Sequence, residues 1–297
     1  MAGFCAVASS SNIAAASADG ITWVQSTLPT SGTWTSIGWN GSVFCALRYQ
    51  SNIAATSPDG ITWTQRTLPA STNWNAIAWS GSLFCAVAYN NSVAATSPDG
   101  ITWTLQTLPA NTTWIAVAWN GSVFCATTQS GNIAATSPDG ITWTQRTLPA
   151  INKAWYGVVG NEGVFCAVAQ SSAIAATSPD GITWTQRTLP ISSEWRSIAW
   201  NGNVFCAVAA FSSIAATSPD GITWTQRTLP VSASWLSTTW DGSVFCAVAY
   251  GGTVAATSPD GITWTQGTLP VSAQWYSVSG AVPPPTFWTN FRRCQEV

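Results

Sequence analysis

The sequence predicts an all-β fold, a seven-bladed β-propeller with four antiparallel strands in each blade. The first observation is a strict repeat, because an S-P-D-G-like turn recurs seven times at spacings of 40 or 41 residues. The second is that each repeat holds four short runs of β-branched, aromatic and small apolar residues, separated by turn residues. Four short strands per repeat are typical of a propeller blade.

One repeat shows how the strands follow from the residues. The spacing predicts strand A over 74–79, strand B over 83–88, strand C over 93–96 and strand D over 101–106. Between C and D, Pro98 sets φ at the second turn position, Asp99 suits the third, and Gly100 supplies a left-handed residue. The C–D connection is therefore predicted to be a tight hairpin.

The two ends of the repeat pattern are complementary. Residues 3–26 supply strands B, C and D, and residues 275–280 supply only a strand A. If these segments pair, the ring of blades is closed without an open strand edge. We therefore expect one domain over residues 1–281 and a Pro-rich tail over 282–297, which is a candidate docking segment.

Composition excludes several classes of partner. Charged residues make up 7% of the chain and the net charge is −2, so the basic field that attracts nucleic acid is missing. No apolar run is long enough for a membrane span, and the first residues lack the pattern of a signal peptide, which leaves the localisation unknown, with association with a virion as one option. Seven of the eight cysteines occupy one repeat position and are expected to be buried thiols; only Cys294 is placed to cross-link.

The segment Ser57-Pro58-Asp59-Gly60-Ile61-Thr62-Trp63 resembles the Asp-box, or BNR repeat, of sialidases and other propellers. It has one residue fewer between Asp and Trp than the commonest form of the box. The resemblance implies a sialidase-like propeller in which each Asp caps backbone amides and each Trp packs beneath the turn. The structural Asp residues are then Asp19, Asp59, Asp99, Asp139, Asp180, Asp220 and Asp260.

Sialidase chemistry, with its arginine triad, Tyr–Glu pair and Asp acid, is not matched by the residues present. Four arginines, Arg66, Arg146, Arg187 and Arg227, recur at one strand position and are expected around the rim. The chain has no histidine, and no carboxylate pair is placed for acid–base work, so Glu194 and Arg196 would have to act almost alone. We expect no enzyme activity, no cofactor and no metal.

Variation between repeats concentrates in the B–C loops and the D–A connections, which share one face in up-and-down blades. Either these loops recognise a ligand or they vary as surface loops ordinarily do. The candidate ligand-binding loop residues are Tyr49, Tyr89, Gln129, Gln170, Phe211 and Tyr250. The tryptophans at the start of strand A are further candidates, with packing between blades as the alternative role; those proposed for binding are Trp74, Trp114, Trp195 and Trp235.

Two hypotheses for function remain open. The first is a non-catalytic, lectin-like propeller that binds cell-surface carbohydrate at several sites; it resembles propeller domains of phage and bacterial adhesion proteins. The second is a structural virion, tail or assembly component whose loops or tail bind protein surfaces. Uncharged polar loops with flat aromatic rings fit either partner.

Overall fold

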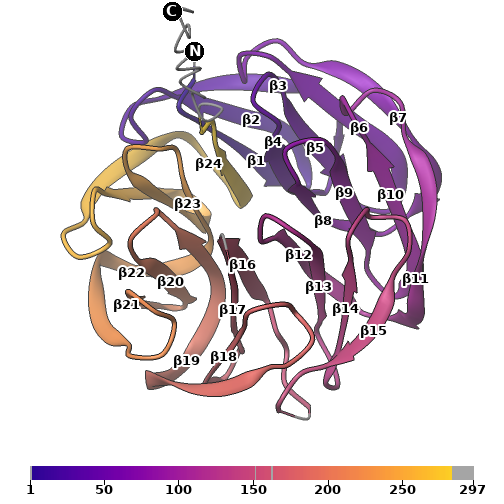
Figure 1. Ribbon diagram of the computed structural model, residues 1–297. Helices are drawn as coiled ribbons and strands as arrows, with labels where there is room; N and C mark the ends of the chain where they lie inside the picture. The colour runs from indigo at the N-terminus through magenta and orange to yellow at the C-terminus, as the bar shows by residue number, and fades with distance from the viewer. Residues whose placement is uncertain (1, 151, 162, 283–297) are drawn as a thin grey trace, which may run out of the picture.

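The computed structural model describes residues 2–150, 152–161 and 163–282. Over these residues it contains strands and turns, with sheets arranged around a common centre (Figure 1). None of the described residues forms a helix, so this part of the chain has no long apolar helix of the kind that crosses a membrane. The expected tail, including Cys294, lies outside the described residues from residue 283 onward.

Three sheets have four strands each and follow the order of the chain. The first contains β4 (Trp34–Trp39), β5 (Phe44–Arg48), β6 (Ser51–Ser57) and β7 (Thr64–Thr72). The second contains β8 (Trp74–Trp79), β9 (Phe84–Ala88), β10 (Asn91–Ser97) and β11 (Thr104–Thr112). The third contains β12 (Trp114–Trp119), β13 (Phe124–Thr128), β14 (Ile133–Ser137) and β15 (Thr144–Thr147). We call such a set of four successive antiparallel strands a blade.

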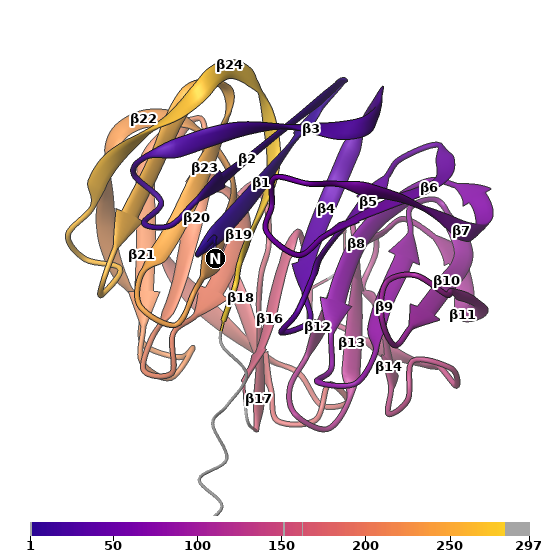
Figure 2. The ribbon, with the colours of Figure 1, turned by 90° about the horizontal axis from the view of Figure 1, so that it is seen from above.

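The remaining strands form one sheet of twelve, because several strands run through two blades. In sheet order it contains β16 (Gly157–Asn161), β17 (Val164–Val168), β18 (Ser172–Ser178), β19 (Thr185–Trp200), β20 (Phe205–Ala210), β21 (Ser212–Ser218), β22 (Thr225–Trp240), β23 (Phe245–Ser258), β24 (Thr265–Gly280), β1 (Phe4–Ser9), β2 (Ser11–Ser17) and β3 (Trp23–Gly32). The first half of β19 pairs with β18 and its second half with β20, so the last strand of one blade becomes the first strand of the next. Figure 2 shows the same strands from above.

The two ends of the repeat pattern lie side by side. Strand β24 pairs antiparallel with β1, from Phe4 opposite Gly280 to Ser9 opposite Gln274. In Figure 1 the last strand, in yellow, runs next to the first, in indigo. A segment near residue 280 and a segment near residue 4 therefore belong to one blade.

The strand boundaries predicted for one repeat are right for strand A and wrong for strand D. The structure has β8 over Trp74–Trp79, as predicted, but β11 begins only at Thr104. Asp99 Oδ1 accepts hydrogen bonds from the amides of Ile101 (2.8 Å) and Thr102 (3.0 Å), which keeps these two residues in the turn. Gly100 has a φ of +76° in this turn, a conformation that glycine adopts at no steric cost because it has no Cβ.

The core lies between neighbouring blades. The tryptophans that begin the predicted strand A of the repeats are fully buried: Trp34, Trp74, Trp114, Trp155, Trp195, Trp235 and Trp275. The indole of Trp74 donates a hydrogen bond to the carbonyl of Ala70 (3.1 Å), so its polar atom is satisfied as well. The seven cysteines of the repeats are buried and unpaired, and burial raises the pKa of each thiol. These residues build the rigid body that carries the site.

Candidate functional site

In six of the repeats a bulge in the innermost strand directs one residue toward the centre. In β8 the pairing with β9 shifts between Trp74 and Ala76, so Asn75 is left outside the ladder. A bulge of this kind turns a side chain away from the alternation of the strand. The residues that follow the buried tryptophans all line one central cavity: Thr35, Asn75, Ile115, Tyr156, Arg196, Leu236 and Tyr276.

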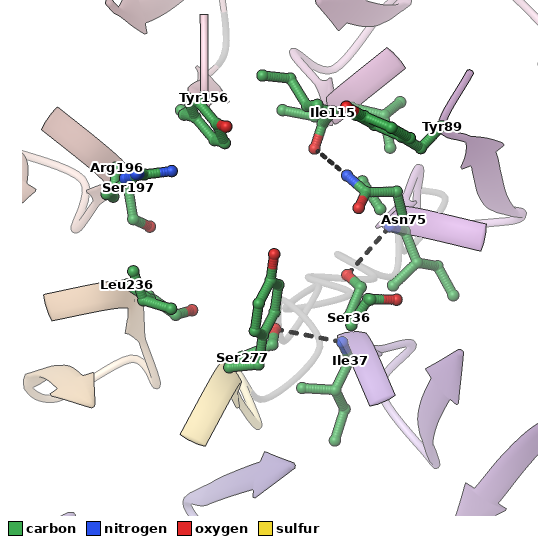
Figure 3. A pocket seen from close by; sticks show the side chains of 18 of the residues that line it. Ser36, Ile37, Asn75, Tyr89, Ile115, Tyr156, Arg196, Ser197, Leu236 and Ser277 are labelled. Atoms are coloured by element: carbon green, nitrogen blue, oxygen red, sulfur yellow. Dashed lines mark hydrogen bonds between the residues drawn. The ribbon is translucent and has the colours of Figure 1, made fainter. Parts of the chain in front are cut away.

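This cavity has a volume of about 670 Å³. Figure 3 shows side chains from successive repeats surrounding it. All five tyrosines of the chain line it, together with Phe211, which is 72% exposed. The tyrosines are Tyr49, Tyr89, Tyr156, Tyr250 and Tyr276. Such a concentration of flat rings with hydroxyl groups is typical of a ligand site.

The structure places five of the six predicted loop residues at this cavity. They are Tyr49, Tyr89, Gln129, Phe211 and Tyr250. Gln170 does not line the cavity, but its amide donates a hydrogen bond to Glu194. Since Gln170 lies in a B–C loop and Glu194 in a D–A connection, this contact shows that the two kinds of connection meet on one face.

The prediction that four tryptophans contact the ligand is wrong. Trp74, Trp114, Trp195 and Trp235 are each 0% exposed. The side chain of Trp74 packs between β8 and the preceding blade, against Leu47 and Leu68. A saccharide has no access to such a ring, so these residues serve packing and not recognition.

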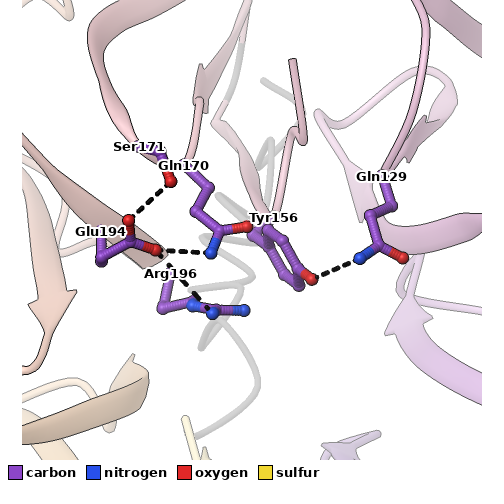
Figure 4. A network of polar contacts seen from close by, with 6 residues as sticks. All are labelled: Gln129, Tyr156, Gln170, Ser171, Glu194 and Arg196. Atoms are coloured by element: carbon purple, nitrogen blue, oxygen red, sulfur yellow. Dashed lines mark hydrogen bonds and ion pairs between the residues drawn. The ribbon is translucent and has the colours of Figure 1, made fainter. Parts of the chain in front are cut away.

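A chain of polar contacts links successive blades along one side of the cavity. The Tyr89 hydroxyl donates to Gln129 Oε1 (2.6 Å), and Gln129 Nε2 donates to the Tyr156 hydroxyl (2.8 Å). The guanidinium carbon of Arg196 lies 4.3 Å from the centre of the Tyr156 ring. The chain fixes the orientation of these side chains before any ligand arrives (Figure 4).

Glu194 ends this chain of contacts. Its carboxylate accepts hydrogen bonds from Ser171 and Gln170, and one oxygen lies 4.0 Å from an Arg196 terminal nitrogen. The Ser171 hydroxyl, followed by the Gln170 amide and the Arg196 charge, holds the pKa of Glu194 below its ordinary value. Glu194 is therefore charged at neutral pH and partly balances Arg196.

Tyr276 also lines the cavity. Burial raises the pKa of its hydroxyl, and the neighbouring Tyr156 raises it further. The Tyr276 hydroxyl is thus protonated at neutral pH and is available as a donor.

Sequence reasoning missed Tyr156, Arg196 and Tyr276 as cavity residues. The signal was present, because the position after the invariant tryptophan holds six different residue types in seven repeats. The four repeated arginines lie elsewhere: Arg66 Nε, for example, donates to Thr56 Oγ1 (2.9 Å), and none of the four lines the cavity.

The described residues contain no group of three or more Asp, Glu or Cys side chains placed to hold a metal ion. Of the residues that line the cavity only Arg196 carries a charge. The arrangement therefore offers stacking surfaces, hydrogen-bonding groups and one cation.

Comparison with solved structures shows the same fold at low sequence identity. A catalytically inactive virginiamycin B lyase from Staphylococcus aureus with quinupristin has a TM-score of 0.71 and 11% identity, covering 80% of this chain and 85% of that one. YCF48 bound to D1 peptide has a TM-score of 0.62 and 18% identity, covering 80% and 83%. A nidogen/laminin complex has a TM-score of 0.61 and 11% identity, covering 79% and 97%. These identities show a shared fold alone.

Among curated proteins, none matches the chain. A family model does match: the model of the DUF6242 beta propeller domain matches residues 17–155 and 138–281. The two matches together include nearly all of the blades described above. The chain therefore belongs to the DUF6242 beta propeller domain family.

Proposed function

We propose that the chain is a non-catalytic recognition propeller that binds a saccharide in its central cavity. The observation that carries this proposal is the gathering of all five tyrosines and Phe211 around one cavity. Sugar rings present flat C–H faces and many hydroxyl groups, so they match aromatic rings set beside amide and hydroxyl groups. The chain from Tyr89 to Glu194 supplies such groups in fixed positions.

The proposed body is a closed ring of seven Asp-box blades. The innermost strands contact one another in the order β4, β8, β12, β16, β19, β22 and β24, and β24 in turn contacts β4. The pairing of β24 with β1 supports closure of the ring by the two ends of the chain. The Asp-box assignment is supported by Asp59, whose Oδ1 accepts hydrogen bonds from the amides of Ile61 (2.8 Å) and Thr62 (2.7 Å).

We propose one central site and no equivalent sites in the separate blades. The tryptophans were the repeated candidates for stacking platforms in several equivalent sites, and these side chains are buried. The residues that face the centre differ from repeat to repeat, as Asn75, Tyr156 and Arg196 illustrate. A site built from different residues recognises one ligand from several sides.

We also propose that the protein does not catalyse a reaction on the bound saccharide. The chain contains no histidine, and no carboxylate lines the cavity, so acid–base chemistry on a bound sugar has no pair of groups to perform it. Turnover of a glycoside or another saccharide by the purified protein would contradict this part.

The test is a glycan-array screen of the purified, reduced protein. We expect binding to one class of glycan, and a decrease of about tenfold or more, equivalent to about 1.4 kcal/mol, on Tyr89→Ala or Tyr250→Ala. The matched control is Ile101→Ala, because Ile101 is 47% exposed in the C–D turn, at the other end of the strand from the B–C loop. An array without any bound glycan would contradict the proposal.

The second candidate is a structural or assembly component that binds a protein surface, in a virion, tail or other assembly. It is supported by the 72% exposure of Phe211 at the cavity mouth, since an exposed aromatic residue is a frequent anchor in protein interfaces. The similar folds of YCF48 with D1 peptide and of the nidogen/laminin complex are consistent with this candidate. Assembly that is lost on deleting residues 283–297, together with a blank glycan array, would favour it.

A further inference from the structure

Arg196 differs from the repeated arginines in having no hydrogen bond to any described residue. Its side chain is 20% exposed, and its Nε is buried without a partner. By contrast, Arg66, Arg187 and Arg227 each donate Nε to a threonine hydroxyl at 2.9 Å. A guanidinium has five N–H donors, and leaving them unpaired in a partly buried position is unfavourable.

Glu194 does not satisfy these donors. Its nearest oxygen is 4.0 Å from the Arg196 terminal nitrogen, which is beyond hydrogen-bonding distance. Both of its oxygens already accept hydrogen bonds, one from Ser171 and one from Gln170. Glu194 thus contributes charge, while the donors of Arg196 remain free for an acceptor in the cavity.

Serine hydroxyls cover some of the backbone amides between neighbouring inner strands. In four places a serine hydroxyl of one inner strand accepts a hydrogen bond from an amide of the next. The pairs are Ser36 with Ile77 (3.2 Å), Ser197 with Thr238 (3.0 Å), Ser237 with Val278 (3.1 Å) and Ser277 with Ile37 (3.3 Å), the last of which is drawn in Figure 3.

In the other three repeats this position is occupied by Ala76, Ala116 and Gly157. The equivalent amide beside Gly157 is that of Ile198, whose nitrogen would lie 3.2 Å from a Cβ at residue 157. Ile198 follows Arg196 in β19, and both residues line the cavity. The Ile198 amide, which has no serine hydroxyl opposite it at residue 157, and the guanidinium of Arg196 therefore belong to one region of the wall.

We infer that this region binds the carboxylate of an acidic saccharide, with Arg196 as its principal donor. This inference rests on the proposed saccharide function. A carboxylate matches the planar fork of a guanidinium with two parallel hydrogen bonds. The cavity lining itself contains no carboxylate. The nearest one is Glu194, 4.0 Å from one terminal nitrogen of Arg196, and its two oxygens already accept hydrogen bonds from Gln170 and Ser171. The ring of Tyr156, 4.3 Å from the guanidinium carbon, holds the fork in place beneath the ligand.

The test compares each carboxylated glycan with its own methyl ester, for example an oligogalacturonate and the esterified oligosaccharide of the same length. We expect binders among the carboxylated glycans, and at least about tenfold weaker binding of the ester. The variant Arg196→Gln should show the same loss. The matched control is Arg227→Gln, which removes the same charge from a residue that does not line the cavity.

Each other outcome is informative. If the esters bind as tightly as the acids, or if only sulfated glycans bind, the inference is wrong while the saccharide function stands. The inference is also wrong if Arg196→Gln binds the acid as tightly as the unchanged protein. If no glycan binds, the proposed function fails as well. The ester comparison uses the unchanged protein, so it decides the matter even if the Arg196 variant does not fold.

Discussion

The guanidinium of Arg196 stacks on the ring of Tyr156, with 4.3 Å between the guanidinium carbon and the ring centre. The two residues follow the buried tryptophans Trp155 and Trp195, so they occupy the same position in neighbouring repeats. The contact therefore crosses from one blade to the next. The Tyr156 hydroxyl is held in turn by Gln129 at 2.8 Å, which links the charge to a third blade.

The stacking contact predicts a difference between two substitutions of Tyr156. Tyr156→Phe retains the ring beneath the guanidinium and loses only the hydrogen bond from Gln129. Tyr156→Ala loses both, and a cation–π contact contributes about 0.5–2 kcal/mol. We expect affinity for a carboxylated glycan, measured by calorimetry, to fall by no more than about threefold in the Phe variant and by about tenfold in the Ala variant. Equal losses would show that the hydroxyl matters and the ring does not.

Most of the repeat could be predicted from its sequence because its signals are local. The alternation of residues and the Gly and Pro turns locate β8 correctly at Trp74–Trp79. The predicted start of β11 is wrong because the Asp99 side chain holds Ile101 and Thr102 in the turn. Both residues are β-branched, so their strand propensity led to the prediction of a strand there.

The candidate site was predicted only in part because the bulge changes which side chains face the centre. A regular strand A would place Trp74 and Asn75 on opposite faces of the sheet. In the structure Trp74 is buried in the core, and the bulge turns Asn75 into the cavity, which the sequence pattern does not show. The loop residues Tyr89 and Tyr250 were found because loop variation is visible in the repeats. Arg196 was considered only as a catalytic group, since its contact with Tyr156 depends on the placement of two blades.

The turn carboxylates predict a dependence of stability on pH. Hydrogen bonds from the amide of Thr62, and also from that of Ile61, hold the pKa of Asp59 below its ordinary value of 3.8. Because the folded-state pKa is depressed, the stabilising effect is present above pH 3.8 and is lost as pH falls through the folded-state pKa. We expect Asp59→Ala to lower the free energy of unfolding by about 1–2 kcal/mol at neutral pH, and by less near pH 3. Urea unfolding at both pH values measures this.

Asp241 provides the matched control for Asp59. It accepts hydrogen bonds from the amides of Ser243 and Val244, both at 2.8 Å, in a turn where another repeat has Asn40. Asn40 Oδ1 makes the same two bonds at 2.9 and 2.8 Å. Asp241→Asn should therefore change the free energy of unfolding by less than about 0.5 kcal/mol. If the effect of Asp59→Ala is the same at pH 7 and pH 3, the charge of Asp59 is not what stabilises the turn.

The pairing of β24 with β1 predicts that the end of the last strand is required for cooperative unfolding. Deleting residues 275–297 removes the part of β24 that pairs with β1 from Phe4 to Ala8, and it removes the fully buried Trp275. The edge of β1 would then be exposed, together with the apolar surface that Trp275 covers. We expect the single sharp thermal transition to be lost, which scanning calorimetry measures.

Deletion of residues 283–297 alone is the control, because it leaves the whole of β24 (Thr265–Gly280) in place. This shorter deletion should melt within a few degrees of the full chain, since it removes none of the residues that pair with β1. A chain without residues 275–297 that still melts in one transition near the original temperature would show that the remaining blades are stable without this pairing. Loss of the transition in the longer deletion alone would identify the pairing of β24 with β1 as the contact on which cooperative unfolding depends.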